Sequence, residues 1–331
     1  MNHDAGPEDT ERPEHGHETG PDPATGPAGM SRRALLRHTA WFGAAVVLTV
    51  AGGEVISHVA RAGEAQAAPG GGDLTFVQVS DSHIGFHGPA NSDVTASFTR
   101  AIDMVNALPR RPDFVLHTGD LTHLATPGQF DQVKQMLTKL RTGQVFVVPG
   151  EHDSTDDAGQ KYRAAFGAGT RGEGWFSFDA KGVHFIGLVN TLNLTKLGHL
   201  GSDQLDFIRK DVAGLSSDTP IVVFSHIPLF AMYPSWGWGT DDAVQALSLL
   251  RRFSSVTCLN GHVHQVFSKT EGNVTFHSAT TTAYPLPHPG EGAGPAPVVL
   301  PAGKLGDALG IRQVTHIRGA HALAIKDQKL A

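Results

Sequence analysis

Residues 74–148 predict an α/β fold, in which helices cover the faces of a largely parallel β-sheet. The first observation is that short, nearly continuous apolar runs alternate with longer segments whose apolar residues recur at helical spacing. The second is that these short runs are nearly continuously apolar, which is typical of strands buried on both faces of a sheet. The third is that two later segments contain paired strands around a tight turn, as β-hairpins do.

Strands and helices alternate strictly in the first half of this domain. The segments LTFVQVS, DFVLH and VFVV are short and rich in β-branched and aromatic residues, which favours strands. The segments between them place their apolar residues on one helical face. We therefore expect strands at 74–80, 113–117 and 145–148, and helices at 94–108 and 129–140.

The second half combines hairpins with further buried strands. We expect hairpins at 175–190 and 266–279, strands at 221–226 and 255–262, and helices at 202–212 and 241–252. Together with the first half these elements would form one domain spanning residues 73–288. Residues 289–331 begin with a Pro/Gly-rich stretch and are expected to form a loosely packed tail with one short element near 305–314.

The N-terminal region has the composition of a leader followed by an export signal. Residues 1–30 are polar and lack any apolar period, which predicts disorder. Residues 31–68 combine Arg32 and Arg33, an apolar run, and small residues at 65–68, which is the layout of a cleavable signal. The arginine pair resembles the twin-arginine signal, so the export machinery that reads it is an expected partner.

Cleavage near Ala67 or Ala68 would release the protein to the periplasm or the exterior. The alternative is an uncleaved membrane anchor. The apolar run at 40–53 is shorter than the ~20 residues that a helix needs to cross a bilayer. We therefore expect no stable membrane span after cleavage.

Composition narrows the classes of partner and site. The chain of 331 residues has a formal net charge of −6 and no basic block, which argues against nucleic acid as a partner. Its single cysteine, Cys258, excludes an internal disulfide framework and a cysteine-rich zinc site. Histidine occurs 19 times, and this side chain binds metals and transfers protons near neutral pH.

Acidic and imidazole side chains follow the predicted strands at the point where each strand ends. Ligands in α/β sheets bind at the carboxyl ends of the strands, so we expect these groups to meet at one edge. The residues concerned are Asp81, His83, Asp120, Glu151, His152, His226, His262 and His264.

So many carboxylates and imidazoles in one pocket require cations. Mixed nitrogen and oxygen donors suit Zn, Mn or Fe, and seven or eight donors exceed the needs of one ion. We therefore expect two divalent or mixed-valence metal ions that share a bridging carboxylate. Two ions ~3.5–4 Å apart can hold phosphoryl oxygens and activate a water as hydroxide, so the sequence predicts a hydrolase of small phosphate esters.

In this order the motifs resemble those of the calcineurin-like metallophosphoesterase superfamily, D-x-H, G-D, G-N-H-[DE], a lone H and G-H-x-H. The resemblance covers roughly residues 74–279. It implies a sandwich of two mixed β-sheets flanked by helices, with the metal site at the carboxyl ends of the strands. The segments SHIPLF and NGHVHQ also resemble the branch that contains class III cyclic-nucleotide phosphodiesterases and related diesterases.

The resemblance also implies a role for each motif residue. His152 would face the leaving oxygen as general acid or electrostatic partner. The ligand sets would be Asp81, His83 and His264 for metal one, and Glu151, His226 and His262 for metal two, with Asp120 as the bridge.

Residue 151 departs from the family pattern, because Glu151 stands where the pattern has Asn. Two divalent ions with two carboxylates leave a charge of about +2 to attract phosphate, whereas a third carboxylate leaves about +1. One hypothesis is that Glu151 ligates metal two and favours a more highly charged ion such as Fe³⁺, or a less charged substrate. The other is that Glu151 lies outside the ligand set and metal two binds weakly or is absent.

The remaining candidates are less specific. His123, which follows G-D-L-T, is expected to reach the edge of the site and contact substrate. His117 is expected in the core or behind the ligands, and the segment Phe230–Gly239 forms either an apolar wall for substrate or an ordinary packed loop. Asn190 could approach the site edge and His277 could orient a ligand.

Three functions fit these features. The first is hydrolysis of phosphomonoesters or phosphodiesters at a dinuclear centre. A narrower one is a phosphodiesterase for cyclic nucleotides or glycerophosphodiesters. A function of another class is a non-catalytic protein that binds metal or an anion at the same edge.

Overall fold

The computed structural model describes residues 44–51, 54–61, 72–192, 194 and 196–331, and only the backbone of those before residue 62. The expected disordered leader, the arginine pair and the expected cleavage site lie outside these residues. Within the expected signal, strands β1 (Ala44–Ala51) and β2 (Glu54–Arg61) pair as an antiparallel hairpin. Among the described residues, no helix combines the length and apolar character that a membrane span requires.

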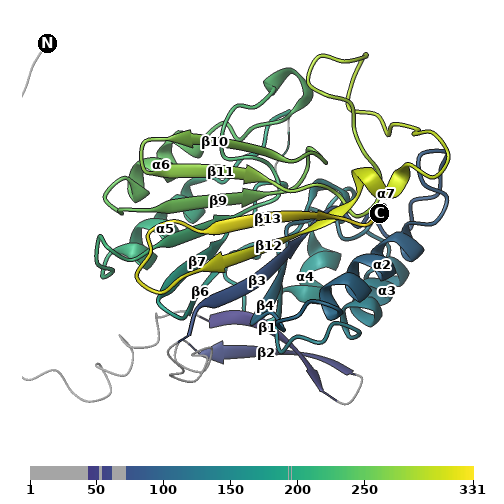
Figure 1. The fold of residues 1–331 in the computed structure, drawn as a ribbon. Helices are drawn as coiled ribbons and strands as arrows, with labels where there is room; N and C mark the ends of the chain where they lie inside the picture. Colours follow the sequence, from purple (N-terminus) through teal and green to yellow (C-terminus); the bar gives the residue numbers. More distant parts are fainter. Residues whose placement is uncertain (1–43, 52–53, 62–71, 193, 195) are drawn as a thin grey trace, which may run out of the picture. The chain divides into compact units, whose positions relative to one another are not determined.

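The first sheet contains the predicted parallel strands. Strands β3 (Leu74–Val79), β4 (Phe114–His117) and β5 (Val145–Val147) lie side by side in parallel. Helices α2 (Val94–Asn106) and α3 (Pro127–Leu137) connect them and lie together against the sheet (Figure 1). Both helices begin at a capping side chain, since Asp93 accepts from the backbone N–H of Ala96 and Thr126 from that of Gln129.

The second sheet has the order β10-β11-β9-β8-β7-β6. The predicted hairpins are present, with Lys181 and Gly182 at positive φ in the turn between β6 and β7. Strands β7, β8, β9 and β11 are mutually parallel, which makes the sheet mixed. Its strands are β6 (Phe176–Ala180), β7 (Val183–Gly187), β8 (Ile221–Phe224), β9 (Val256–Asn260), β10 (Phe267–Glu271) and β11 (Val274–Ser278).

Helices and short turns of helix complete this part of the chain. Both predicted helices of the second half are present and place an apolar face on the core around the second sheet. The elements are α4 (Gln160–Phe166), α5 (Ser202–Val212), α6 (Ala243–Leu250) and the 3-10 turns η2 (Glu151–Asp153) and η3 (Pro234–Trp236). The predicted sandwich of two mixed β-sheets with flanking helices is therefore confirmed.

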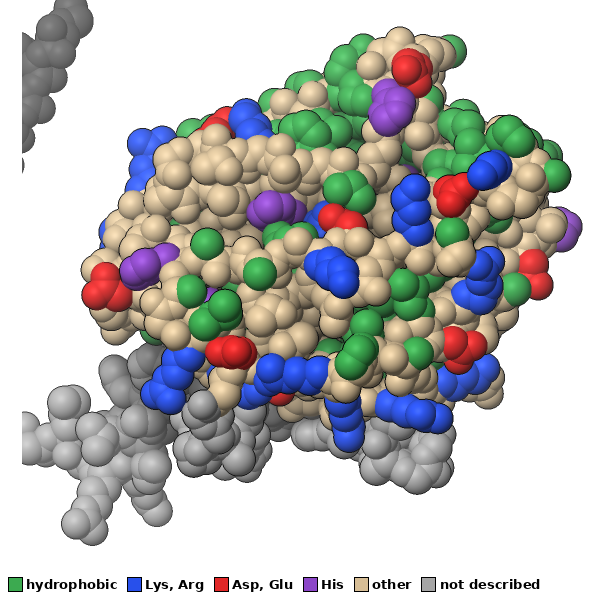
Figure 2. Space-filling model, in the orientation of Figure 1, with side chains coloured by type: hydrophobic (Ala, Val, Ile, Leu, Met, Phe, Trp, Pro, Cys, Tyr) green, Lys and Arg blue, Asp and Glu red, His purple; other side chains and the backbone are tan. Residues whose placement is uncertain are grey.

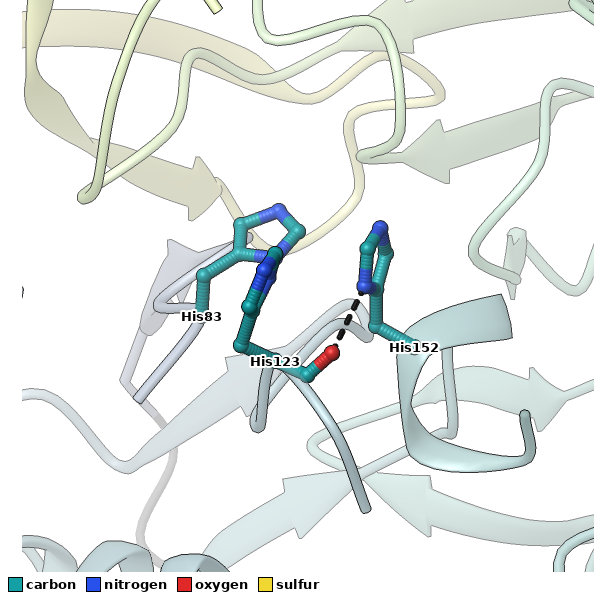
Figure 3. A group of neighbouring side chains, drawn as sticks. All are labelled: His83, His123 and His152. Carbon is teal, nitrogen blue, oxygen red and sulfur yellow. Dashed lines mark hydrogen bonds between the residues drawn. The ribbon is translucent and has the colours of Figure 1, made fainter. Parts of the chain in front are cut away.

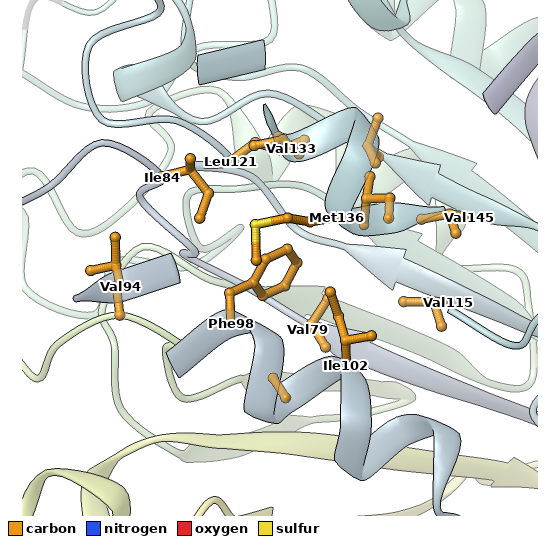
Figure 4. Close-up of a cluster of buried hydrophobic side chains, with 14 of the residues drawn as sticks. Val79, Ile84, Val94, Phe98, Ile102, Val115, Leu121, Val133, Met136 and Val145 are labelled. Carbon is orange, nitrogen blue, oxygen red and sulfur yellow. The ribbon is translucent and has the colours of Figure 1, made fainter. Parts of the chain in front are cut away.

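Strand β3 shows why its sequence is apolar on both faces. Leu74 and Phe76 contribute to the core between the two sheets, whereas Val77 and Val79 belong to the cluster that packs on α2 and α3 (Figure 4). The core between the sheets is aromatic, with the ring centroids of Phe146 and Phe178 3.8 Å apart. Each fully buried side chain of this size stabilises the fold by about 1.5–3 kcal/mol, so the two layers hold the strand ends in place.

The C-terminal region differs from the expected loosely packed tail. After α7 (Leu305–Ala308), strand β12 (Gly310–His316) pairs antiparallel with β3, and β13 (Ala324–Lys329) pairs with β12 (Figure 1). The expectation was wrong because polar residues interrupt β12. One of them, Arg312, is buried and donates to Asp327, to the carbonyl of Ser278 and to Gln78.

Charged side chains are interspersed over the face that Figure 2 shows, with basic groups beside acidic ones.

A buried histidine lies between two carboxylates in the second sheet. His184 on β7 lies 2.8 Å from Asp179 through Nδ1 and 2.8 Å from Asp211 through Nε2. Burial alone would lower the pKa of His184, but the two carboxylates raise it to about 9.

This arrangement predicts a pH dependence of stability. The pKa of His184 is raised from 6.5 to about 9 in the folded chain, so its contribution is complete below pH 6.5 and disappears as the pH rises towards 9. Since a pKa difference of one corresponds to about 1.4 kcal/mol, the loss amounts to a few kcal/mol. Denaturant unfolding at several pH values should show this fall, and His184→Gln should flatten it. Equal slopes in both proteins would contradict the prediction.

Candidate metal centre

The five strand-end loops converge as the sequence predicts. Each loop brings one or two carboxylate or imidazole groups to the same edge, and most of these groups are buried. Within each of four sets, the candidate ligand atoms lie within 4.8 Å of one another. The sets are Asp81, His83 and His264; Glu151, His226 and His262; Asp81, Asp120 and His226; and Asp120, Glu151 and His152.

In the first set, the candidate ligand atoms of Asp81, His83 and His264 lie close together. Nε2 of His264 lies 3.3 Å from Oδ1 of Asp81 and 3.2 Å from Nε2 of His83. Nε2 of His83 lies 3.5 Å from Oδ2 of Asp120. The residues expected at metal one therefore face a common centre, and their role as ligands stays a prediction.

The second set is organised by Glu151. Its Oε2 lies 2.9 Å from Nε2 of His226, and its Oε1 lies 2.8 Å from Nδ1 of His262. Oδ2 of Asp120 lies 3.4 Å from Nε2 of His226, and the same oxygen faces His83 in the first set. Asp120 thus occupies the position between the two sets that a bridging carboxylate requires.

Backbone carbonyls determine which nitrogen of two imidazoles faces the centre. Nδ1 of His226 donates to the carbonyl of Thr118 at 2.7 Å, and Nδ1 of His264 donates to the carbonyl of Tyr284 at 2.6 Å. Nε2 of each ring is thereby directed at the carboxylates. Such an acceptor behind the ring is the usual way in which proteins orient a histidine ligand.

The donor set fits metal ions. Five buried atoms of the cluster have no hydrogen-bond partner among the described residues, namely Oδ2 of Asp81, Nδ1 of His83, Oε2 of Glu151, Nε2 of His226 and Nε2 of His262. Oε2 of Glu151 and Nε2 of His226 approach closely without an oriented hydrogen bond, as two ligands of one cation do. Buried polar atoms without partners are costly, and a cation beside Oε2 of Glu151 and Nε2 of His226 would satisfy both.

The charges of the cluster also favour a cation. Burial would lower the pKa of His226, but Asp120 and Glu151 raise it well above its ordinary value. Burial would raise the pKa of Asp81, but His264 and His226 lower it. Asp81 therefore stays ionised and attracts positive charge into a buried site.

The backbone at the ligands is strained. Asp81, His83, Asp120, His262 and His264 have φ values between 42° and 67°, in the left-handed region that non-glycine residues seldom adopt. Such residues cost about 1–3 kcal/mol each and persist where surrounding contacts fix them. Here the N–H of Asp81 donates to the carbonyl of Gly119, and that of His83 to the carbonyl of Asp120.

Glycine before a ligand has a steric reason in this site. A Cβ atom on Gly150 would lie 2.0 Å from Oδ1 of Asp120, and one on Gly261 would lie 2.5 Å from Oδ2 of Asp81. The two loops can therefore approach the carboxylates this closely only with glycine at positions 150 and 261.

Asp153 supports the loops of the site, a role that the sequence did not reveal. Its buried carboxylate accepts the backbone N–H groups of Leu121, Thr122 and Gly150 at 2.8–3.0 Å, together with the hydroxyl of Thr122. Burial and the neighbouring Asp120 raise the pKa of Asp153 to about 6, although the backbone donors lower it. Asp153 ties the loop of Asp120 to the loop of Glu151 and His152.

His123 and His152 lie beside the first set. Figure 3 shows both rings next to His83, with Nδ1 of His152 donating to the backbone carbonyl of His123 at 2.8 Å. The backbone N–H of His152 donates to Oδ1 of Asp120 at 2.9 Å. The predicted position of His123 at the edge of the site agrees with its partial burial.

The other candidates have structural roles. His117 is buried against Ser82 and Phe98, as expected for a core residue. Asn190 is buried and binds the backbone of Ile227, next to His226, through both ends of its amide. His277 lies on β11, and no described contact links it to a ligand.

The loop Phe230–Gly239 has a packed base. Phe230 stacks on Phe267 and contacts Phe276, and Trp238 is buried beside Trp236. These contacts favour the interpretation as an ordinary packed loop over that as a substrate wall.

A family model described as calcineurin-like phosphoesterase matches residues 74–266. A probable cyclic nucleotide phosphodiesterase of Psychrobacter arcticus is 23% identical over 64% of this chain and 81% of that protein. The 3',5'-cyclic-nucleotide phosphodiesterase of a Nostoc species is 24% identical over 57% of this chain and 70% of that protein. A probable glycerophosphodiester phosphodiesterase of Arcobacter nitrofigilis is 24% identical over 58% and 72%, respectively.

Solved structures share the fold. Purple acid phosphatase from yellow lupin superposes with a TM-score of 0.56 at 14% identity, covering 79% of this chain and 52% of that one. A dimetal phosphatase from Danio rerio superposes with a TM-score of 0.50 at 15% identity, covering 78% and 99%. At these identities the likeness concerns the arrangement of strands and helices.

Proposed function

The chain belongs to the calcineurin-like phosphoesterase family, and we propose that its reaction is the hydrolysis of a small phosphodiester. Membership makes it a hydrolase of phosphoric esters, with small phosphoesters as substrates. The observation that carries the proposal is the pair of ligand sets that share Asp120, with His152 beside them. Cyclic nucleotides and glycerophosphodiesters are the first candidates, because curated relatives are named for them.

Charge supports a diester over a monoester. Three buried or half-buried carboxylates, Asp81, Asp120 and Glu151, surround the centre. With two divalent ions the net charge would be about +1, whereas the family pattern with Asn leaves about +2. A diester carries one negative charge near neutral pH and a monoester close to two. A lower positive charge in the site therefore weakens the attraction of a diester less than that of a monoester.

The protein groups have distinct tasks in this reaction. When bound, two metal ions would supply charge that holds phosphoryl oxygens and activates a water for attack at phosphorus. Asp81, His83 and His264 would hold one ion, Glu151, His226 and His262 the other, and Asp120 both.

His152 is placed to protonate the leaving oxygen. Its Nδ1 already donates to the carbonyl of His123, so Nε2 is the nitrogen available to substrate. Burial would lower the pKa of His152, but Asp120 and Glu151 raise it above its ordinary value. A ring that keeps its proton near neutral pH can act as a general acid.

Hydrolysis of nitrophenyl mono- and diesters with Mn, Zn or Fe tests this function. We expect turnover of the diester, with kcat/KM above that for the monoester, and release of the nucleoside monophosphate or glycerol phosphate from natural candidates. His152→Asn should lower kcat by ~10²–10⁴-fold, because the general acid is lost. Metal-loaded protein without turnover of any ester would instead identify a non-catalytic protein that binds metal or an anion.

We also propose that Glu151 ligates the second ion, with Fe, Mn and Zn as the candidate elements. A trivalent ion in this site would restore a net charge of about +2, and it is the alternative to the preference for a diester that a pair of divalent ions implies. Both of its oxygens face imidazoles of the second set, at 2.9 and 2.8 Å. Oxygen-rich sites with more negative charge hold harder, more highly charged cations.

Elemental analysis of Glu151→Asn and Glu151→Gln tests this role. We expect both variants to lose iron relative to zinc or manganese, since the neutral amide removes one negative charge from the second set. The first set is unaltered and serves as the internal control, so about one ion per chain should remain firmly bound. Unchanged metal identity and stoichiometry would reject the proposal and place Glu151 outside the ligand set.

We further propose that the N-terminal segment directs export by the twin-arginine route. The support is sequence alone, namely Arg32 and Arg33, the apolar run after them and the alanines at 65–68. Cell fractionation should find the protein outside the cytoplasm with a mass that corresponds to cleavage near Ala67 or Ala68. Lysine at both arginine positions should retain it inside, and a full-length protein in the membrane fraction would indicate an uncleaved anchor instead.

A further inference from the structure

His123 belongs to neither ligand set, yet its ring is held against the site. It stacks on His152 with ring centroids 4.9 Å apart and an angle of 18° (Figure 3). It also meets the ring of Phe86 edge-on at 5.2 Å and that of His83 at 5.7 Å. Three aromatic neighbours therefore fix the plane of this imidazole.

The backbone of His123 is fixed as firmly. Its N–H donates to the carbonyl of Ile84 at 3.0 Å, which ties it to the loop of Asp81 and His83. Its carbonyl accepts Nδ1 of His152 at 2.8 Å, which leaves Nε2 of His152 for substrate. His123 thus holds a neighbouring proton donor without using its own side chain.

The ring nitrogens of His123 remain to be explained. Nδ1 is buried and has no hydrogen-bond partner among the residues that the structure describes. One nitrogen each from His83, His123 and His152 lies within 4.8 Å of the others. Nε2 of His123 is not enclosed in this way and has no described hydrogen bond, so it is the nitrogen of this ring that a ligand at the grouping can reach.

The chemistry of the grouping favours an oxygen anion over a third metal ion. His83 already faces the first ligand set, so only His123 and His152 are left to bind another group, and two imidazoles are fewer protein ligands than a metal ion takes. An imidazole always carries at least one N–H, so two stacked rings can each donate to an oxygen. Adjacent oxygens of one phosphoryl group suit two such neighbouring donors.

We propose that His123 binds substrate by donating a hydrogen bond to a phosphoryl oxygen beside the one addressed by His152. The inference rests on the proposed function for the identity of the substrate, while binding of phosphate itself does not depend on turnover. A hydrogen bond to a charged group contributes enough to change affinity about 10-fold or more.

Three variants test the proposal. His123→Phe keeps an aromatic ring for stacking on His152 and removes both nitrogens, whereas His123→Asn restores a donor without the ring. Leu124→Ala is the matched control, because Leu124 is 56% exposed and adjoins His123. Each protein is loaded with the same metal, and inorganic phosphate binding is measured by calorimetry beside KM and kcat for a nitrophenyl diester.

We expect His123→Phe to weaken phosphate binding and to raise KM about 10-fold while kcat changes less. His123→Asn should recover part of this loss. Leu124→Ala should match the wild type in all three quantities. Unchanged phosphate affinity in His123→Phe would overturn the proposal. A fall in kcat alone would also overturn it, since it would assign His123 only the support of His152. Phosphate binding that depends on His123 in a protein without turnover would uphold the site and reject the hydrolase.

Discussion

The concentration of negative charge in a buried cluster of side chains is the constraint on which the rest of the site depends. Asp81 and Asp120 are 0% and 1% exposed, and Glu151 faces the same centre. Carboxylates this close repel one another strongly in a medium of low dielectric constant. Imidazoles from four loops surround them, and where no cation neutralises the charge the fold must hold every loop against this repulsion.

The restraint comes from a buried hydrogen-bond network under the loops. Arg312 on β12 contacts Gln78, and Gln78 donates to Thr118 and to the carbonyl of Asn260. The carbonyl of Thr118 in turn orients His226, and Asn260 immediately precedes the glycine of the G-H-x-H loop. A chain of satisfied polar contacts of this kind is rigid, because each member would be costly to leave unpaired. The C-terminal strands are therefore part of the support of the site.

The sequence was sufficient where a local pattern determined the structure. Continuous apolar runs predicted the buried strands, and the residues that follow them predicted which side chains meet. The sequence was insufficient to predict structure that depends on residues far apart in the chain. The strand β12 lies beside β3, and its buried Arg312 binds the carbonyl of Ser278. The resemblance to the family singled out Glu151 as the candidate ligand, but the sequence did not show what the neighbouring acid Asp153 contacts. The turn η2 directs Glu151 to the imidazoles and Asp153 to backbone N–H groups, although both are acids in one motif.

The contacts of Glu151 explain how the site accommodates its departure from the family pattern. Its side chain is one methylene longer than that of Asn, and its two oxygens reach His226 and His262 separately. An amide in the same place would offer one oxygen and one NH₂ group, and the NH₂ group cannot ligate a cation. The carboxylate therefore joins the two imidazoles of the second set in a way that Asn cannot. Glu151 therefore differs from the Asn of the family pattern both in its charge and in the length with which it reaches the two imidazoles.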